Sequence, residues 1–349
     1  MKLTDLSSRT TDWFSGKGSL ADIVISSRIR LARNIAGVKF ISKCTNDEKQ
    51  NILTTLKHNI LSLEAIGECL FINVAQGSHI EREFLIERQL ISRNLAAGKG
   101  PRGVIITKNE LFGAMINEED HLRIQALAAG MDLENCWKRI TKIDDMVSEK
   151  TKFAFSRKYG YLTACPTNVG TGIRVSVMLH LPALKMTEQL KKMFDAVRDM
   201  GLTVRGIFGE GTEAVGDFFQ ISNQVTLGVS EEKIVEYFTV SIIPKIVSYE
   251  RLAREELLRK NADLLDDKIA RALAVLKNAR LISSHEALFL LSSLRLGINT
   301  GRIKDISIQT VNEIFMLTQP AHLQINSGEI LSPEKRDSLR AQQLRARLN

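Results

Sequence analysis

The sequence lacks the long hydrophobic segments of membrane and secreted proteins. It contains no run of about 18 apolar residues, whereas a membrane-spanning helix needs about 20. The first residues, Met1 to Lys17, are polar and mixed, without the basic start and apolar centre of a secretory leader. We therefore expect a cytoplasmic protein that does not associate with membranes. Internal repeats and low-complexity segments are also absent.

Cysteine and histidine are scarce, with four cysteines and six histidines in 349 residues. Disulfide frameworks and zinc sites place cysteines at short, paired spacings. The cysteines at positions 44, 69, 136 and 165 show no such pairing, and the histidines have no metal-ligand spacing. We therefore expect free thiols and no metal ion held by a dedicated set of protein ligands.

Aromatic residues are also few, at 6% of the chain, although a net charge of +8 and a pI near 9.3 suggest an anionic partner. Nucleic-acid surfaces interleave basic residues with aromatic side chains that stack on bases. Little interleaving is present, and much of the basic surplus lies in a few motifs and in the tail from Lys335 to Arg347. We expect no direct nucleic-acid contact. A basic surface could instead attract acidic proteins or phosphorylated groups.

The most informative segment is Cys165 to Arg174, which combines a thiol, a glycine-rich turn and an arginine within ten residues. Its glycines let the backbone approach a ligand closely, because they have no side chain. From Ile173 to Leu181 the residues alternate, which predicts a strand with Arg174 opposite the most apolar row. On its own, the segment could equally be a glycine turn entering a half-buried strand, with Cys165 as a small buried hydrophobe.

A second segment, residues 23–33, places arginines on a predicted strand. Ser26, Arg28 and Arg30 share one face of it by the two-residue period. Arginine donates planar, multidentate hydrogen bonds to phosphate oxygens, so this row is well suited to hold phosphates. The alternative is an exposed edge strand whose charges discourage edge-to-edge pairing.

Acidic residues follow two further predicted strands. The apolar run at 111–116 predicts a strand that delivers the acids of 118–120 to a loop, and residues 122–127 then predict a helix. Alone, these acids would be typical of a helix N-terminus. Arg205 ends another apolar strand, and Glu210 follows in a glycine-rich loop that either changes shape around a ligand or forms a hairpin.

In this order and spacing the segments resemble the ATP:guanidino phosphotransferases, the family that includes the phosphagen kinases. The resemblance covers about residues 20–250 and continues in Gln220-Ile221-Ser222-Asn223. It implies an α+β fold, with a catalytic domain built on an antiparallel β-sheet flanked by helices. It also implies MgATP as phosphoryl donor and a guanidinium group as acceptor.

The resemblance implies roles for the motif residues. Glu119 and Glu210 would flank the guanidinium, orient one nitrogen in line with the γ-phosphorus and act as general base. Cys165 would lie beside the guanidinium and polarise it without forming a covalent intermediate. Mg²⁺ would be held mainly by phosphate oxygens and water. Gln89 stands where phosphagen kinases have a nucleotide-contacting histidine, with His79 a less favoured substitute. The ATP-binding residues would be Ser26, Arg28, Arg30, Arg123, Arg174 and Arg205.

This sequence differs from the phosphagen kinases at two places, and these differences indicate which branch of the family it resembles. Only 25 residues precede Ser26, so the longer helical domain that encloses a small substrate in phosphagen kinases has no counterpart. Beyond about residue 250, periodic apolar residues predict helices at 264–276, 284–296 and 308–317. The chain therefore resembles the bacterial branch of the family that phosphorylates arginine side chains in proteins.

This branch implies two domains, a catalytic domain at 1–255 and a helical dimerisation and regulatory domain at 256–349. A simple helical cap is the alternative for the second. An Arg-Asp-x-x-Arg-Ala element is associated with phosphoarginine binding there, and the tail has it at 336–341. Arg336 and Arg340 lie one helical turn apart and could hold one phosphate, while Asp337 could accept from a guanidinium. The implied allosteric residues are Arg336, Asp337, Arg340 and Ala341. A solvated basic tail is the competing interpretation.

We therefore expect an enzyme that transfers the γ-phosphoryl group of MgATP to arginine residues of proteins. The branch implies a homodimer, a zinc-binding activator protein, and targets that include a stress-response repressor and misfolded proteins marked for a Clp-type protease. Transfer to free arginine is the alternative reaction. A silent phosphoarginine-binding adaptor is the non-enzymatic alternative, but it would have no need for these acids, this thiol and these arginines.

Overall fold

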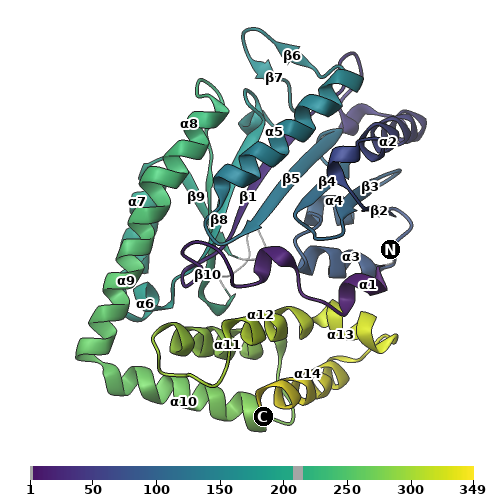
Figure 1. Cartoon of the computed structure of the whole chain (residues 1–349). Helices are drawn as coiled ribbons and strands as arrows, with labels where there is room; N and C mark the ends of the chain where they lie inside the picture. The colour runs from purple at the N-terminus through teal and green to yellow at the C-terminus, as the bar shows by residue number, and fades with distance from the viewer. Residues whose placement is uncertain (1–2, 207–214) are drawn as a thin grey trace.

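The computed structural model describes residues 3–206 and 215–349, and Glu210 lies outside them. At its centre, the described part has an eight-stranded sheet in the order β2-β3-β4-β5-β1-β8-β10-β9 (Figure 1), and all neighbouring pairs are antiparallel. The strands are β1 (Val24–Arg33), β2 (Cys69–Asn73), β3 (Gly103–Thr107), β4 (Phe112–Ile116), β5 (Leu122–Ala129), β8 (Ile173–His180), β9 (Leu202–Gly206) and β10 (Phe218–Asn223). A separate hairpin joins β6 (Phe155–Ser156) and β7 (Gly160–Tyr161).

The alternating segments form the expected strands. Residues 23–33 and 173–181 are confirmed as β1 and β8, which pair at the centre of the sheet. Ile173, Val175 and Val177 all enter the main core, as the two-residue period requires. The strands predicted before the acids of 118–120 and up to Arg205 are confirmed as β4 and β9.

The helix predicted at 122–127 is wrong, because this segment is strand β5. It pairs with β1 on one side and with β4 on the other. Leu122 and Ile124 lie in the main core, whereas Arg123 and Gln125 line a cleft on the other side, which is the period of a strand. Periodicity in a short apolar run does not separate a buried strand from a buried helix, so the sequence alone was ambiguous here.

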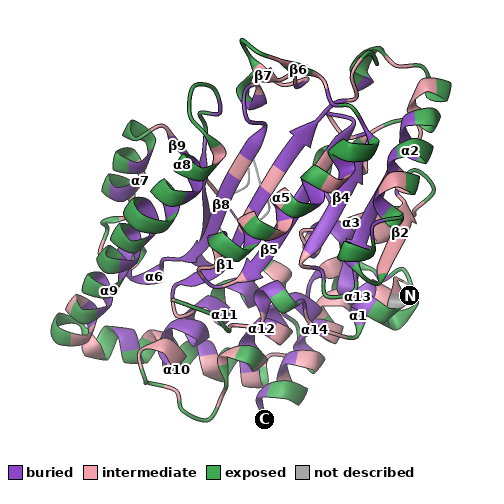
Figure 2. Ribbon diagram, turned by 45° about the horizontal axis from the view of Figure 1, so that its top comes forward, coloured by how far each residue is buried: buried purple, intermediate pink, exposed green. Residues whose placement is uncertain are grey.

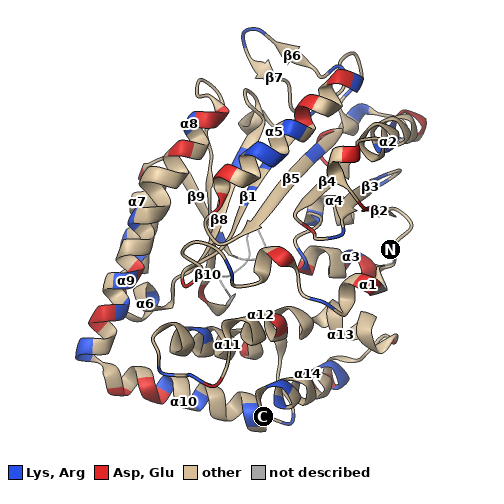
Figure 3. Ribbon diagram, in the orientation of Figure 1, with Lys and Arg blue, Asp and Glu red and all other residues tan. Residues whose placement is uncertain are grey.

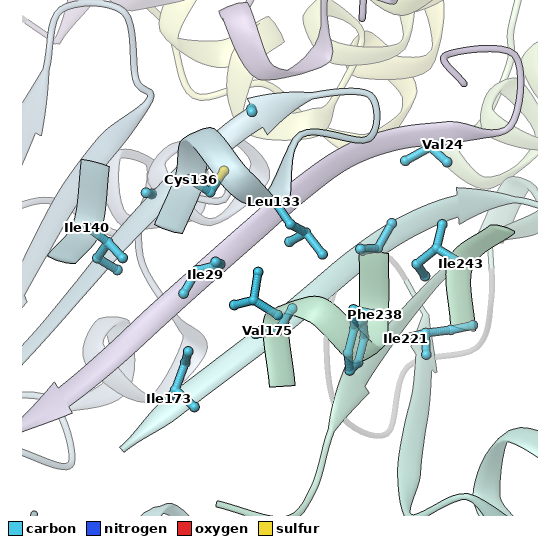
Figure 4. Close-up of a cluster of buried hydrophobic side chains, with 14 of the residues drawn as sticks. Val24, Ile29, Leu133, Cys136, Ile140, Ile173, Val175, Ile221, Phe238 and Ile243 are labelled. Carbon is cyan, nitrogen blue, oxygen red and sulfur yellow. The ribbon is translucent and has the colours of Figure 1, made fainter. Parts of the chain in front are cut away.

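One face of the sheet is covered by helices and carries the main core (Figure 2). Helix α5 (Leu133–Lys150) packs across β5 and β1, α2 (Asn46–Leu61) contacts β4, and α7 (Leu190–Asp199) contacts β9. Figure 4 shows Leu133 of α5 and Phe238 on the same side of the sheet as Ile29, Val175 and Ile221. Phe238 belongs to a π-helical turn that joins α8 (Glu231–Glu236) to α9 (Ile243–Lys260). This face is therefore structural.

The other face is covered only in part. Over β3 and β4, α3 (His79–Glu87) and α4 (Arg93–Ala97) form a second cluster in which Phe84 packs with Val104 and Ile106. Over Met178 and Phe218, C-terminal helices and a 3₁₀ turn at Asp12–Phe14 form a third cluster. A stretch of sheet between these two coverings borders a cleft.

The C-terminal region is helical, and the three helices predicted there are confirmed. Its elements are α10 (Ala262–Asn278), α11 (Ser284–Asn299), α12 (Ile308–Leu317), α13 (Pro320–Ser327) and α14 (Pro333–Leu348). The side chains of Ser283, Ser307 and Ser332 accept first-turn N–H groups at the starts of α11, α12 and α14, which explains where these helices begin. Figure 3 shows Lys and Arg residues along α14 and both charge signs on α10. Helix α9 runs through residues 255 and 256, where the domain boundary is predicted.

Two short helices, α1 (Thr4–Ser7) and α6 (Pro182–Met186), complete the described elements of regular helix. The four cysteines are free thiols, as expected. Among the described residues, no helix combines the length and apolar character needed to cross a membrane.

Candidate active site

Strand register brings the arginines of separate motifs to one face of the sheet. Arg30 on β1 lies directly opposite Arg174 on β8. Arg123 on β5 lies opposite Ala32, which has the same orientation as Arg30 because the two are two positions apart on the strand. Arg205 on β9 lies opposite Gln220 on β10, which in turn lies opposite Met178, four residues along from Arg174. The arginines that share this face are Arg28, Arg30, Arg123, Arg174 and Arg205, which we call the arginine cradle.

The arginine cradle lines a cleft of about 540 Å³. Among the described residues, six arginines and two glutamates border this cleft, together with Cys165 and Gln89. Ser26 borders a small adjoining cavity with Arg28 and Gln220. A separate cavity of about 410 Å³, near Lys108, contains none of the predicted residues. Every predicted catalytic and ATP-binding residue that the structure describes is thus brought to this cleft or beside it.

Arg28 and Arg30 carry charges that their surroundings do not neutralise. Burial, reinforced by the charges of Arg123 and Arg174, lowers the pKa of Arg28 to about 10 and that of Arg30 well below its ordinary value. Arg28 donates to neutral acceptors, Gln89 Oε1 at 3.1 Å and Gln220 Oε1 at 2.5 Å. The buried Nε of Arg30 has no hydrogen-bond partner in the described part of the chain. Buried like charges of this kind call for an anion between them.

Arg123 differs from the other cradle arginines because it has a carboxylate partner. Burial alone would lower its pKa, but the ion pair with Glu118, at 2.7 Å, outweighs burial and raises it. Ser92, the N-cap of α4, also donates to Glu118. Arg174 donates to the hydroxyls of Thr203 at 3.2 Å and Ser222 at 3.3 Å. These contacts hold the guanidinium groups in place on a rigid sheet.

Glu119 and Cys165 meet at the edge of the cradle. Burial and the neighbouring Asp120 raise the pKa of Glu119, although Arg123 and a side-chain hydrogen bond with Cys165 oppose the rise. The Cys165 sulfur also lies 3.0 Å from Thr167 Oγ1, within the turn that precedes β8. A carboxylate whose pKa is raised toward neutrality is suited to accept a proton.

The predicted phosphoarginine residues lie apart from this cleft, on α14. Arg340 is buried and donates from Nε to Thr318 O at 2.9 Å, and from Nη1 to Ile282 O at 2.8 Å. It also pairs with Asp337 at 2.6 Å. Half-buried Arg336 donates to Leu331 O at 3.0 Å. Ala341 is fully buried in the third cluster. None of these four residues borders the cleft.

Sequence reasoning missed several residues of the cleft. Arg93 adds a sixth arginine from α4, and Gln125 lines the cleft from β5 and donates to Gln89 O at 3.0 Å. The two-residue period of β5 would have placed Gln125 beside Arg123 if the segment had been assigned as a strand. Ser92 is recognisable only as a helix cap. Gln89 borders the cleft and contacts Arg28, and its role at the nucleotide stays a prediction.

Comparison with known proteins agrees with this geometry. Residues 51–253 match the family model described as ATP:guanido phosphotransferase, C-terminal catalytic domain. Residues 262–349 match the model described as Protein-arginine kinase McsB C-terminal domain. The chain belongs to the ATP:guanido phosphotransferase family, in its protein-arginine kinase branch.

Full-length relatives in this family are closely similar. The chain is 44% identical over 351 residues to a protein-arginine kinase of Halothermothrix orenii, covering 100% of both sequences. It is 44% identical over 341 residues to that of Bacillus subtilis, covering 97% of this chain and 93% of the relative.

Solved structures of the family share the fold. A lombricine kinase aligns with a TM-score of 0.59 and 25% identity, over 70% of this chain and 71% of that one. A duplicated taurocyamine kinase from Schistosoma mansoni, with bound transition state analog components, aligns with a TM-score of 0.61 and 24% identity, over 80% of this chain and 41% of that one. The α+β fold implied by the sequence resemblance is confirmed.

Proposed function

We propose that this protein is a protein-arginine kinase, which transfers the γ-phosphoryl group of ATP to the guanidinium group of arginine residues in proteins. The observation that carries the proposal is the arginine cradle, with Glu119 and Cys165 bordering the same cleft. Full-length identity of 44% to a protein-arginine kinase supports the choice of protein arginine as acceptor.

The cradle would hold the nucleotide phosphates. In phosphoryl transfer, charge is spread over the equatorial oxygens of the moving group, so catalysis is mostly positioning and electrostatic stabilisation. Arg28, Arg30, Arg123, Arg174 and Arg205 supply fixed positive charge in a partly dry cleft, where it is more effective than in water. Ser26 and Gln89 border Arg28 and would contact the nucleotide on that side.

The guanidinium would be held at Glu119 and Cys165. An arginine guanidinium has a pKa above about 12 and no free lone pair, so it must be oriented and deprotonated before it attacks. One terminal nitrogen attacks the γ-phosphorus, the bond from the γ-phosphorus to the bridging oxygen breaks, and ADP leaves. Glu119 accepts the proton that this nitrogen loses. Glu210, outside the described residues, is proposed as the second carboxylate at the guanidinium.

Mg²⁺ would accompany ATP, and it neutralises part of the phosphate charge when bound. The cleft residues fit a metal held through phosphates, because the cradle is built of arginines that match phosphate oxygens. Of the two described acids that border the cleft, Glu118 is already engaged by Arg123 and Ser92. We therefore assign phosphate oxygens and water as the magnesium ligands.

The location, oligomeric state, targets and partners that we propose rest on the resemblance to this branch of the family. We propose a cytoplasmic homodimer with a catalytic part at 1–255 and a regulatory part at 256–349. Its targets would include a stress-response repressor and misfolded proteins marked for a Clp-type protease, and a zinc-binding activator protein would be a partner.

We also propose that Arg336, Asp337, Arg340 and Ala341 form an allosteric phosphoarginine site. Arg340 ties α14 to the ends of two other elements, through Ile282 O before α11 and Thr318 O after α12. A ligand that changed these hydrogen bonds would shift the ends of both α11 and α12. Arg340→Ala should lower the kinase activity although it leaves the cleft intact, and unchanged kinetics would contradict this site.

Mass spectrometry under conditions that spare acid-labile phosphorus–nitrogen bonds tests the proposed function. An arginine-rich protein is incubated with the enzyme, Mg²⁺ and ATP, beside Glu119→Ala and the exposed α5 variant Glu134→Ala as matched control. We expect phosphoarginine with the wild type and Glu134→Ala but not with Glu119→Ala. Phosphorylation of added free arginine instead would identify a phosphagen-type kinase, and no transfer to either acceptor would contradict the proposal.

A further inference from the structure

A single carboxylate oxygen joins the two segments that carry Glu119 and Cys165. Oδ1 of Asp120 accepts a hydrogen bond from the backbone N–H of Ala164 at 2.7 Å and from Nδ2 of Asn34 at 2.6 Å. The Asp120 residue is only 3% exposed. Because Asp120 follows Glu119 and Ala164 precedes Cys165, this oxygen fixes the separation of the two backbones that bear these side chains.

Asn34 links Asp120 to strand β1, which lies on the side of the cleft where the phosphates are proposed to bind. It directly follows β1, the strand that carries Arg28 and Arg30. Its Oδ1 accepts from the N–H of His121 at 2.9 Å, and its Nδ2 also donates to Leu162 O at 3.0 Å. Asn34 therefore touches both the 118–121 loop and the segment before Cys165.

Asp120 does not border the cleft itself. Its Oδ1 is occupied by two donors from the protein and the residue is buried away from the cleft, so it is poorly placed to take a proton from a substrate. Its contribution must therefore pass through the groups that it holds. Those groups are the segments of Glu119 and Cys165, which both border the cleft.

We propose that Asp120, held by Asn34, is a positioning residue that sets the spacing between Glu119 and Cys165. This spacing fixes the geometry in which both side chains bind the guanidinium. This inference rests on the proposed function, because it assigns the spacing to guanidinium binding. A misplacement of about 1 Å in a catalytic constellation can lower the rate about 10²-fold.

The kinetic test compares a variant that removes the acceptor oxygen with one that keeps it. We expect Asp120→Ala to lower kcat on a protein substrate about 10²-fold. Asp120→Asn has nearly the same shape and retains an amide oxygen for both donors, so its kcat should stay within about tenfold of the wild type. ADP affinity should remain within about twofold in both, because the arginine cradle is untouched. Asp145→Ala, an exposed change on α5, is the matched control.

Amide hydrogen exchange tests the same link without turnover. The peptide that contains Ala164 should exchange faster in Asp120→Ala and at the wild-type rate in Asp120→Asn, with β3 unchanged in both. If Asp120→Ala does not fold, Asn34→Ala serves, since it removes one of the two donors that hold the Asp120 carboxylate and should give a smaller local increase in exchange at Ala164.

The outcomes separate this inference from the proposed function. Equal loss of kcat in Asp120→Asn and Asp120→Ala, with normal protection at Ala164 in the former, would show that the charge matters and would overturn the positioning role. Unchanged exchange at Ala164 in Asp120→Ala would also overturn it. If the wild type phosphorylates no protein, the proposed function fails, while the exchange result still decides whether Asp120 holds the two segments together.

Discussion

Arg30 and Arg340 are both largely buried, yet they are in opposite electrostatic situations. Arg30 faces the like charges of Arg28, Arg123 and Arg174, and its Nε has no partner in the described part of the chain. Arg340 donates to two backbone carbonyls and pairs with Asp337. The difference indicates that the cradle is completed by an anion from outside, whereas Arg340 already holds the protein's own segments together.

The sequence did not distinguish these two arginines. Both were assigned to phosphate, because both share a helical or strand face with a second arginine. Their partners come from distant segments, Thr318 and Ile282 in one case and neighbouring strands in the other. A pattern gives the face on which a residue lies, and the contact that neutralises it depends on tertiary packing.

The largest effect on stability should come from another internally satisfied arginine, Arg88. It forms a buried pair with Glu110, in which the side chains are 0% and 1% exposed, and donates to Arg9 O at 3.1 Å. Arg88→Met would leave Glu110 buried and unpaired, which costs about 3–5 kcal/mol. Urea unfolding measures the loss, with exposed Arg271→Met as control, which should change stability far less because its ion pair is exposed to solvent. If Arg88→Met and Arg271→Met changed stability equally, the contrast between arginines that the protein itself neutralises and the arginines of the cradle would fail.

The next effect concerns activity. Removing one preorganised donor to a developing charge lowers kcat about 10²–10³-fold, so Arg30→Met should lose phosphoryl transfer by that factor. Arg30→Met should also bind ADP more weakly than the wild type, because the cradle holds the phosphates of the nucleotide. Steady-state kinetics and calorimetric ADP titration provide the measurement. A variant with normal ADP affinity would remove Arg30 from the nucleotide site.

The sequence predicted some strands and helices of this protein and missed others. Alternation located β1 and β8 and the cradle face on them, apolar runs located β4 and β9, and helical periodicity located α12 with its bounds. Periodicity failed at 122–127, because a short apolar run does not separate a buried strand from a buried helix. The packing of Phe14 against Phe315, at 5.2 Å between ring centroids, joins distant parts of the chain and leaves no local signal. The same is true of Asn34 and Asp120.

The pH dependence offers a smaller but more specific test. Glu119 accepts a proton only when ionised, and its pKa is raised, chiefly by burial and then by Asp120. Activity should therefore fall, as pH is lowered, at a pH above the ordinary titration range of glutamate. Removing the Asp120 charge in Asp120→Asn should move this acid limb to lower pH. Profiles of kcat/KM against pH measure the shift, and Asp145→Asn, an exposed change on α5 outside the cleft, should leave the limb in place.

The measurement that tests the central contrast most directly is thermal unfolding of Arg30→Met and Arg340→Met, each without and with MgATP. Without ligand, Arg30→Met should be more stable than the wild type by about 1 kcal/mol, because it relieves buried like charges. Arg340→Met should be less stable by about 2–3 kcal/mol, because it leaves buried carbonyls unpaired. MgATP should stabilise Arg340→Met as it does the wild type and should no longer stabilise Arg30→Met. If both variants lose stability and both keep the stabilisation by MgATP, the cradle is not the nucleotide site.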